Sequence, residues 1–330
     1  CDLGSVNNSF LQVCQEMKLD SITDSIIVGQ NTSASSLNRS FVAGNYNDLM
    51  NLNFVDVFGD SNKMYSVSDF TLHGEQNDIS TNTYNDALFG KNNYLNSGII
   101  NSTVFGDRNR LFTGVENTYV NGVENTLNNN VTHSFTVGSG NNLHDGVHNS
   151  YINGDGNTAA FTVNNSFCAG KMNDLQQHAD NLYVNGNANY FNNVAGGIIV
   201  GDNNAASGTG GTLTHFAGFG SNLHIKGGWT YAAGGSISAY GSSRAGYSID
   251  VGTNIVQNNT YQFNLGENLV TDKSYSVNVG RNNLSQGTYE LTIGEDNTNY
   301  KNKAAEIGTG LWNYNDNSLV VGKYNVRYAD

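Results

Sequence analysis

The sequence predicts an all-β fold: a parallel β-solenoid of the flattened β-roll type, built from 14–16-residue coils. Three observations support this prediction. Glycines recur at nearly constant spacing, an asparagine follows most of them by three positions, and short runs of strand-forming residues precede them. The chain also has 39 glycines, no proline and only 13% charged residues, a composition typical of turns repeated many times and not of helices lined with ion pairs.

The glycine repeat falls into two series. In the first series, the residue numbers of successive glycines differ by 15 or 16: Gly44, Gly59, Gly74, Gly90, Gly106, Gly122, Gly138, Gly154, Gly170, Gly186 and Gly201. In the second series, they differ by 14 each time: Gly252, Gly266, Gly280, Gly294, Gly308 and Gly322. The rhythm breaks between the two series, where we expect Gly220 and Gly235 to mark the coils.

Glycine and asparagine define one sharp corner of each coil, because both residues tolerate positive φ. Three successive central coils show the structural turn residues: Gly106 with Asn109, Gly122 with Asn125, and Gly138 with Asn141. Strand formers lie before each glycine and further apolar positions after it, so each period predicts two short strands and two corners, about twenty coils in all. A run of antiparallel hairpins is the alternative, but hairpins give no reason for one fixed corner per period.

We expect four segments along the chain. Residues 1–24 lack the repeat and are expected to cap the first coil, whose strand edge would otherwise stay unpaired. Residues 25–204 form the β-roll with 15–16-residue coils, residues 205–247 form an irregular insertion rich in glycine and aromatic residues, and residues 248–330 form the β-roll with 14-residue coils.

Apolar residues occupy both faces of the strand before the glycine in the central coils. The pairs expected to point to opposite sides are Tyr119 and Val120, Phe135 and Val137, Phe167 and Cys168, and Tyr183 and Val184. One face fills the interior, where Cys168 serves as a small buried hydrophobe. The other face needs a second surface, which a symmetric oligomer supplies; an exposed aromatic stripe on a monomer is the alternative.

The 14-residue coils differ, because the residue two positions before the glycine is polar there. We expect these side chains on a wetter outward face, or hydrogen-bonded between subunits: Asp250, Asn264, Asn278, Thr292 and Glu306.

The charge and the cysteines limit the function classes. A formal net charge of −13 makes the chain a poor ligand for DNA, RNA or anionic lipid, which select basic surfaces. No apolar run approaches the length of a membrane span, and no signal peptide is visible, so we expect a mature segment or an excised fragment. Cys1 and Cys14 are close enough in sequence for a disulfide in an oxidising compartment, and a lipidated Cys1 is the other interpretation.

The expected insertion at 205–247 holds the main candidate site. Loops on a rigid scaffold often carry function, and Trp, Tyr and Arg are favoured anchors at binding surfaces. The candidate partner-binding residues are Phe219, His224, Lys226, Trp229, Tyr231 and Arg244. The alternative is an irregular coil whose aromatic residues fill a gap where the coil length changes. A second candidate is the row at the opposite corner, with Tyr94, Phe112 and Phe191.

The sequence offers little catalytic or metal chemistry. It has no nucleophile elbow, P-loop, zinc pair or EF-hand loop, and we expect no enzyme activity, no cofactor and no metal. The run His144-Asp145-Gly146-Val147-His148 offers two imidazoles and a carboxylate, but it occurs once, at a variable corner, where solvated residues are the better interpretation. A polysaccharide-acting solenoid enzyme would need acids grouped on one face, whereas the acids here are scattered.

The repeat resembles the head repeat of trimeric autotransporter adhesins. The pattern Asn-Ser-x-x-x-Gly-x-x-Asn carries the resemblance in three segments: residues 149–154, 165–170 and 317–322. The resemblance covers nearly the whole chain and is best in the 14-residue coils. It implies a left-handed parallel β-roll in a threefold homotrimer. The chain departs from the family in its longer central coils, in its aromatic residues where the family has small ones, and in the interruption at 205–247.

The resemblance also implies the expected function. Such heads stand on the surface of Gram-negative bacteria, anchored in the outer membrane through C-terminal regions that this chain does not contain. They act in cell adhesion and virulence by binding host proteins, such as CEACAM-type receptors or collagen and other matrix proteins. We therefore expect an adhesin head that binds a host receptor and is not inserted in the membrane. The alternative is a structural or receptor-binding segment of a phage or secretion-system fibre.

Overall fold

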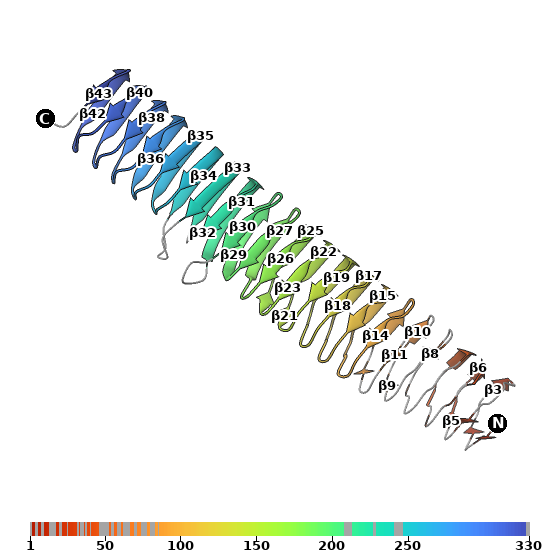
Figure 1. Cartoon of the computed structure of the whole chain (residues 1–330). Coiled ribbons are helices and arrows are strands. Elements are labelled where there is room, and N and C mark those ends of the chain that lie inside the picture. The colour runs from red at the N-terminus through yellow and green to blue at the C-terminus, as the bar shows by residue number, and fades with distance from the viewer. Residues whose placement is uncertain are drawn as a thin grey trace. The chain divides into compact units, whose positions relative to one another are not determined.

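The structure is a computed structural model, which describes residues 86–207, 213–226, 229–240 and 247–327 continuously, together with short stretches between 2 and 84 (Figure 1). The chain divides into two compact units, Cys1–Asn165 and Ser166–Asp330, each of which is a stack of coils. The described residues contain strands and no helix, and none of their segments forms a helix that could cross a membrane. They form a parallel β-solenoid of about 14 turns, and the expected corner glycines Gly59 and Gly74 lie outside the described residues.

In the first unit, the strands before the corner glycine stack in parallel between Ala87 and Asp155, and each 16-residue coil lies directly on the next. They are β13 (Ala87–Phe89), β15 (Thr103–Asp107), β17 (Tyr119–Val123), β19 (Phe135–Ser139) and β22 (Tyr151–Asp155). The strands after the corner form a second stack of β14 (Tyr94–Leu95), β16 (Arg110–Leu111), β18 (Thr126–Leu127), β20 (Asn142–Leu143) and β23 (Thr158–Ala160). A third row, not expected from the sequence, joins β21 (Val147–His148) to β24 (Val163–Asn164) and continues as single bridges through Thr132, Glu116 and Ile100.

The N-terminal stretches that the structure describes are short strands: β1 (Asp2–Leu3), β2 (Val6–Asn7), β3 (Phe10–Gln12), β4 (Lys18–Leu19), β5 (Ile22–Thr23), β6 (Ile26–Gln30), β7 (Phe41–Asn45), β8 (Asp56–Val57), β9 (Val67–Ser68), β10 (Thr71–His73), β11 (Asp78–Ile79) and β12 (Thr83–Tyr84). Asp2 pairs with Lys18, and Phe10 pairs with Ile26, which is the same 16-residue offset as in the coils between Ala87 and Asp155. The solenoid register therefore extends into residues 1–24, and the capping role of that segment stays a prediction.

In the second unit, the strands before and through the glycine corner are β25 (Phe167–Lys171), β27 (Asp180–Asn185), β29 (Val194–Val200), β31 (Leu213–Ser221), β33 (Thr230–Tyr240), β34 (Ser248–Gln257), β35 (Gln262–Thr271), β36 (Ser276–Arg281), β38 (Leu291–Glu295), β40 (Ala305–Thr309) and β42 (Leu319–Lys323). The strands after the corner are β26 (Asp174–Gln176), β28 (Tyr190–Asn192), β30 (Ala205–Ser207), β32 (His224–Lys226), β37 (Leu284–Ser285), β39 (Thr298–Asn299), β41 (Trp312–Asn313) and β43 (Val326–Arg327). From β34 onward the strands pair in the 14-residue register expected from the second glycine series.

Regular strands also run through the expected insertion at 205–247. There, β31 pairs with β29 and β33, and β32 pairs with β30 and β33, all in parallel. The corner glycines of these coils are Gly220 and Gly234, with φ of 144° and 137°. The expectation of Gly235 was wrong by one position, because Gly234 pairs with Gly220 and Gly252 in the stack, which places Gly235 just past the corner.

The corner glycines stack directly on one another, as the sequence predicted. Gly106 pairs with Gly122, and Gly122 with Gly138. A Cβ atom on Gly122 would lie 1.7 Å from the carbonyl oxygen of Gly138, and the φ of Gly122 is 142°. Both the backbone conformation and the close approach of the next coil therefore require glycine at this corner.

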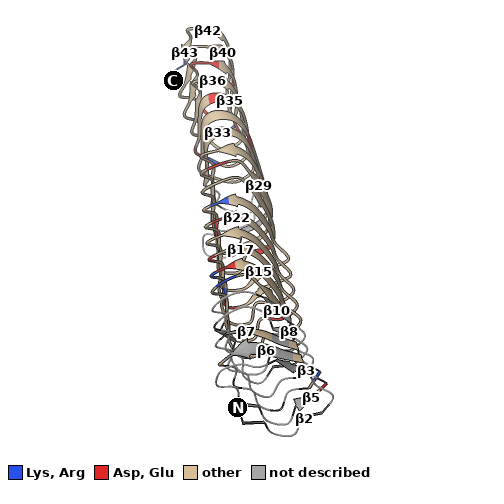
Figure 2. Cartoon of the chain, turned by 90° about the vertical axis from the view of Figure 1, so that its right-hand side faces the viewer, with Lys and Arg blue, Asp and Glu red and all other residues tan. Residues whose placement is uncertain are grey.

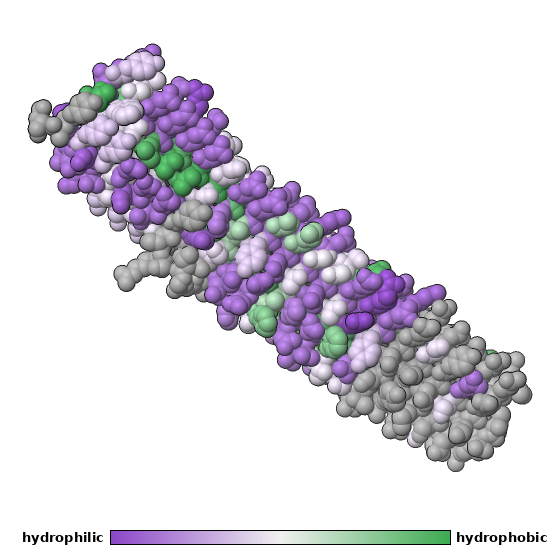
Figure 3. Space-filling view, in the orientation of Figure 1, coloured by the Kyte–Doolittle hydropathy of each residue, from purple (hydrophilic) through white to green (hydrophobic). Residues whose placement is uncertain are grey.

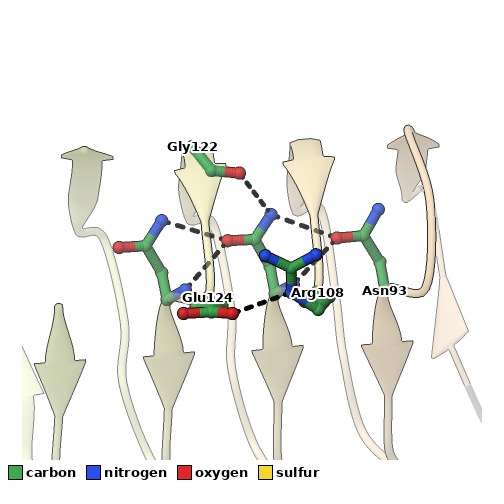
Figure 4. A network of polar contacts seen from close by, with 6 residues as sticks. Asn93, Arg108, Gly122 and Glu124 are labelled. Atoms are coloured by element: carbon green, nitrogen blue, oxygen red, sulfur yellow. Dashed lines mark hydrogen bonds and ion pairs between the residues drawn. The ribbon is translucent and has the colours of Figure 1, made fainter. Parts of the chain in front are cut away.

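A buried asparagine ladder runs beside the glycine stack of the first unit (Figure 4). The amide nitrogen of Asn125 donates to the side-chain oxygen of Asn109 at 3.0 Å and to the carbonyl of Gly138 at 2.9 Å. The same pattern repeats from Asn109 to Asn93 and from Asn141 to Asn125. Outside the ladder, Arg108 and Glu124 form an ion pair of 2.8 Å, and Figure 2 shows how sparse charged residues are elsewhere. The ladder thus supplies hydrogen-bond donors from within the stack to the carbonyls of Gly106, Gly122, Gly138 and Gly154.

The interior begins with the residue two positions before each corner glycine. In the first unit that position holds Val104, Val120, Thr136 and Ile152, all buried. Tyr119 and Val120 do lie on opposite faces, but Phe135 and Val137 lie on the same outward face, because Thr136 between them points inward. In the second unit the same position holds Cys168, where burial raises the pKa of the thiol to about 12 and Asn173 partly offsets this effect.

The expectation for the 14-residue coils was wrong. The polar residues two positions before the glycine do not face outward but are completely buried: Asp250, Asn264, Asn278, Thr292 and Glu306. The stacked corner fixes which face of the strand points inward, and this register is the same in coils of every length. The side chains follow the register of the backbone, so these coils enclose a polar interior.

We predict that Gly122→Ala destabilises the solenoid by on the order of 3 kcal/mol or more, because its Cβ would overlap the Gly138 carbonyl. Gly140→Ala is the matched control, since Gly140 also has a positive φ of 64° but its Cβ would meet nothing nearer than 4.0 Å. Thermal unfolding followed by circular dichroism compares the two variants. Equal losses of stability would show that backbone strain alone, and not the stacking of coils, requires the glycine.

Candidate functional site

The predicted partner-binding residues lie on three different parts of the second unit. Phe219 on β31 and Tyr231 on β33 point outward, with ring centroids 6.0 Å apart. Trp229 directly precedes β33 and is exposed. His224 and Lys226 lie on β32, beyond the glycine corner, so they do not share a face with the aromatic residues. Arg244 lies outside the described residues.

His224 is half-buried, and burial lowers the pKa of its imidazole, with a further contribution from the charge of Lys226. Both effects favour the neutral ring. The β32 pair therefore offers one lysine cation and a largely neutral histidine, and not a doubly charged patch.

Trp229 belongs to a continuous row of aromatic rings, which lies five positions before the corner glycines, at the opposite end of the strand from the glycine corner. We name this row the corner ladder: His215, Trp229, Tyr247, Tyr261, Tyr275 and Tyr289. Successive ring centroids are 4.2, 5.6, 5.7, 4.8 and 4.8 Å apart. All six side chains are exposed. The sequence analysis missed the four tyrosines, although each stands five positions before a corner glycine, a spacing that could have revealed them.

Three of the four tyrosines of the corner ladder occupy a strained backbone position. Tyr261, Tyr275 and Tyr289 have φ of 57°, 61° and 62°, a region that bulky residues rarely adopt. In the first unit the same position carries Asn117 and Asn149, whose side chains tolerate this conformation better. Such strain costs about 1–3 kcal/mol per residue, whereas an aromatic pair contributes about 0.5–1.5 kcal/mol. Stacking at most offsets the strain, so packing within the chain does not explain why rings stand here.

A second exposed surface lies on the strands next to the corner ladder. We name it the outward wall, and it consists of the side chains one and three positions before each corner glycine. In the second unit its most exposed apolar members are Tyr183, Ile198, Phe219, Tyr231, Ile249, Phe263, Leu265, Ile307, Leu319 and Val321. Leu319, which begins β42, and Val321, at the middle of that strand, are each 58% exposed. Figure 3 shows hydrophobic patches among mainly hydrophilic residues on one side of the described molecule.

The outward wall of the first unit is largely aromatic. Phe89 stacks on Phe105 at 4.6 Å, and Tyr119, Phe135 and Tyr151 continue the stacking at 4.7 and 4.9 Å. These rings are half-buried by one another, and their remaining surface faces away from the interior. Each unit thus presents an apolar wall outside its coils.

The second candidate row divides in the structure. Tyr94 and Phe112 are half-buried and meet edge to face, with centroids 6.1 Å apart. Phe191 is fully buried and packs near Phe216 in the interior, so it is a core residue.

The histidine-rich corner is held by ordinary polar contacts. Nδ1 of His148 lies 2.6 Å from the Thr132 hydroxyl, and Nε2 of His144 lies 3.1 Å from the Asn142 amide. His144 also stacks near Phe161. Within the described ranges, no three His, Cys, Asp or Glu side chains gather in a metal-binding arrangement.

Two surfaces therefore remain as candidates, the corner ladder and the outward wall, and both suit contact with another macromolecule. Their exposed atoms are aromatic and aliphatic, and they line regular strands and corners. A scan against models of known protein families and a search of curated proteins both find no match to this chain.

Proposed function

We propose that this chain is the head of a homotrimeric, surface-exposed bacterial adhesin, which acts by binding a host protein and not by catalysis. The observation that carries the proposal is the pairing of two exposed apolar surfaces on one regular scaffold. Phe219 and Tyr231, the members of the outward wall next to the corner ladder, supply together with that ladder a surface for a receptor, and the rest of the outward wall supplies a surface for association between copies.

The outward wall supports self-association. Scattered apolar residues are normal on a protein surface, but rows that continue from coil to coil form a contiguous patch of the kind that marks an interface. A flat wall repeated on identical chains can pack against itself around a symmetry axis. The threefold state follows from the similarity of the Asn-Ser-x-x-x-Gly repeat to trimeric adhesin heads.

The corner ladder and its neighbours support receptor binding. Tyrosine and tryptophan are the residue types that most often carry binding energy in protein interfaces, and here they are held rigid by stacking and by the sheet. A rigid, exposed aromatic row loses little side-chain entropy on binding. An immunoglobulin-like receptor domain of the CEACAM type or a collagen triple helix offers the extended surface that such a row can contact.

We predict that Phe263→Asp combined with Leu265→Asp dissociates the trimer, because the two carboxylates would be buried between copies. Sedimentation equilibrium should report a mass three times that of the 35.5 kDa chain for the wild type and that of one chain for the variant at the same micromolar concentration. The control is Asn268→Asp, which adds a carboxylate at an exposed corner where Asp296 already stands in the same row. A wild-type chain that sediments as a monomer would refute the trimer.

We predict that Trp229→Ala combined with Tyr231→Ala weakens receptor binding at least about tenfold, since aromatic anchors of this kind contribute about 2 kcal/mol or more. Surface plasmon resonance on an immobilised CEACAM-type receptor domain and on collagen measures the loss. The matched control is Tyr300→Ala, which removes an exposed tyrosine that stacks on Tyr314 away from the corner ladder. Unchanged binding by the double variant would exclude this surface as the receptor site.

A further inference from the structure

The coils between 247 and 327 enclose a polar interior, which sets them apart from the rest of the described chain. Two rows point inward from opposite sides of the corner. The first holds Asp250, Asn264, Asn278, Thr292 and Glu306, and the second holds Gln257, Thr271, Ser285, Asn299 and Asn313, all of them buried. In the first unit the corresponding rows are mostly Val, Ile and Leu. These coils therefore bury groups whose desolvation must be met by hydrogen bonds inside the stack.

Three carboxyl groups lie in this interior: Asp250, Glu290 and Glu306. Their exposed fractions are 0%, 3% and 0%. Among the residues that the structure describes, no lysine, arginine or histidine is buried. An ionised carboxylate in such surroundings has no opposite charge to compensate its loss of water.

Of the three carboxyl groups, Glu306 has the fewest neighbouring groups that could stabilise a negative charge. Neither of its carboxyl oxygens has a hydrogen-bond partner, and the Thr292 hydroxyl and the Asn299 amide nitrogen, both buried in the preceding coil, also lack one. A neutral carboxylic acid carries both a donor and an acceptor, whereas a carboxylate only accepts. The protonated form is therefore the one that this interior can accommodate at the smaller cost.

The elements packed around Glu306 supply no cation. Glu306 lies on β40, which pairs with β38 and β42. Strand β38 turns Thr292 inward, and Glu295 of this strand pairs with Arg281 on the outside. Strand β42 turns Val320 inward, and Lys323 of this strand is exposed. The strands β39 and β41 contribute only the amides of Asn299 and Asn313 to the interior. On the return turn, Lys301 is half-buried and Lys303 is exposed. The charged group that acts on Glu306 is Glu290, which carries a negative charge when it is ionised and so opposes ionisation of Glu306.

The other two acids are held by hydrogen bonds that tolerate either form. The Asn264 amide donates to Asp250 at 2.6 Å, and the Thr271 hydroxyl donates to Asn264 at 2.6 Å, while the second oxygen of Asp250 has no partner. Glu290 accepts from the Ser285 hydroxyl, and the charge of Asp272 lies near enough to disfavour a second negative charge.

We propose that the coils 247–327 contain a proton-dependent lock, in which protonated Asp250, Glu290 and Glu306 hold the polar interior together and their ionisation loosens these coils.

The sign of the pH dependence follows from the direction of the shifts. Burial raises the pKa of Asp250 and of Glu290 to about 7, and burial together with the charge of Glu290 raises the pKa of Glu306 to about 8. In the unfolded chain these groups ionise near pH 4. The folded state thus holds more protons than the unfolded state between about pH 4 and pH 8, so stability is fully present below that window and is lost as the pH rises through it.

Trp312 allows a local test, because it lies on β41 in the same coil as Glu306 and is one of only two tryptophans. In a Trp229→Phe background, its fluorescence reports unfolding of these coils alone. We expect the midpoint of thermal unfolding to fall by about 5 °C or more between pH 5 and pH 9. The triple variant Asp250→Asn, Glu290→Gln and Glu306→Gln should flatten this dependence, and Glu306→Gln alone should reduce it in case the triple variant does not fold.

The matched control is Glu267→Gln, which removes an exposed carboxylate from the same unit and should follow the parent at every pH. A parent midpoint that is constant or rises from pH 5 to pH 9 would overturn the proposal, and so would a Glu306→Gln variant whose pH dependence equals that of the parent. Because the readout needs no receptor, its failure would leave the adhesin proposal untouched, and loss of receptor binding would leave the lock untouched.

Discussion

The close approach of successive coils at the glycine corner is the constraint on which the rest of the structure depends. The space between Gly122 and the Gly138 carbonyl does not admit even a methyl group. Because this approach repeats, it fixes the register between neighbouring coils and, through the strand period of two, which side chains point inward. The asparagine ladder then satisfies the polar backbone that such a tight corner buries. Coils can shorten towards the C-terminus without disturbing this register, because the difference in length is absorbed on the return side.

The sequence predicted the corner well, because glycine and asparagine there answer a strict steric requirement. It predicted the contents of the 14-residue coils poorly. Asp250 and Glu306 look like surface residues by hydropathy, but they lie in the interior because the corner glycine two positions later sets their side of the strand. Gly234 and Gly235 are adjacent, and only the register of the neighbouring coils distinguishes them. The spacing of the tyrosines was visible, yet their stacking depends on the stacking of coils and cannot be inferred from one period.

The candidate site was also predicted only in part, because its rings are brought together by the stacking of coils. Trp229 and Tyr231 were expected within an irregular insertion, where any aromatic residue could serve either binding or gap filling. The structure places both in one regular coil: Trp229 lies directly before β33, in the corner ladder, and Tyr231 lies on β33 itself. The sequence interpretation put Trp229 in an insertion and the tyrosines up to Tyr289 in the regular 14-residue coils. The solenoid aligns these residues in one row. Alignment along the stack, and not proximity in sequence, is what defines a surface on this fold.

In the 14-residue coils, polar side chains fill much of the interior, and apolar side chains form the outward wall. A short coil encloses little volume, and in the coils from 252 to 322 that volume is largely filled with amides, hydroxyls and carboxyls. Hydrogen bonds contribute about 1 kcal/mol each, whereas a buried aliphatic side chain contributes about 1.5–3 kcal/mol. Some aliphatic residues of these coils are buried, such as Ile255, Leu269 and Leu311, but others stand outside, at Leu265, Ile307 and Leu319. A surface that covers these outward residues would add to the stability of these coils, whereas in the first unit Val104, Leu111 and Val120 already contribute from the interior.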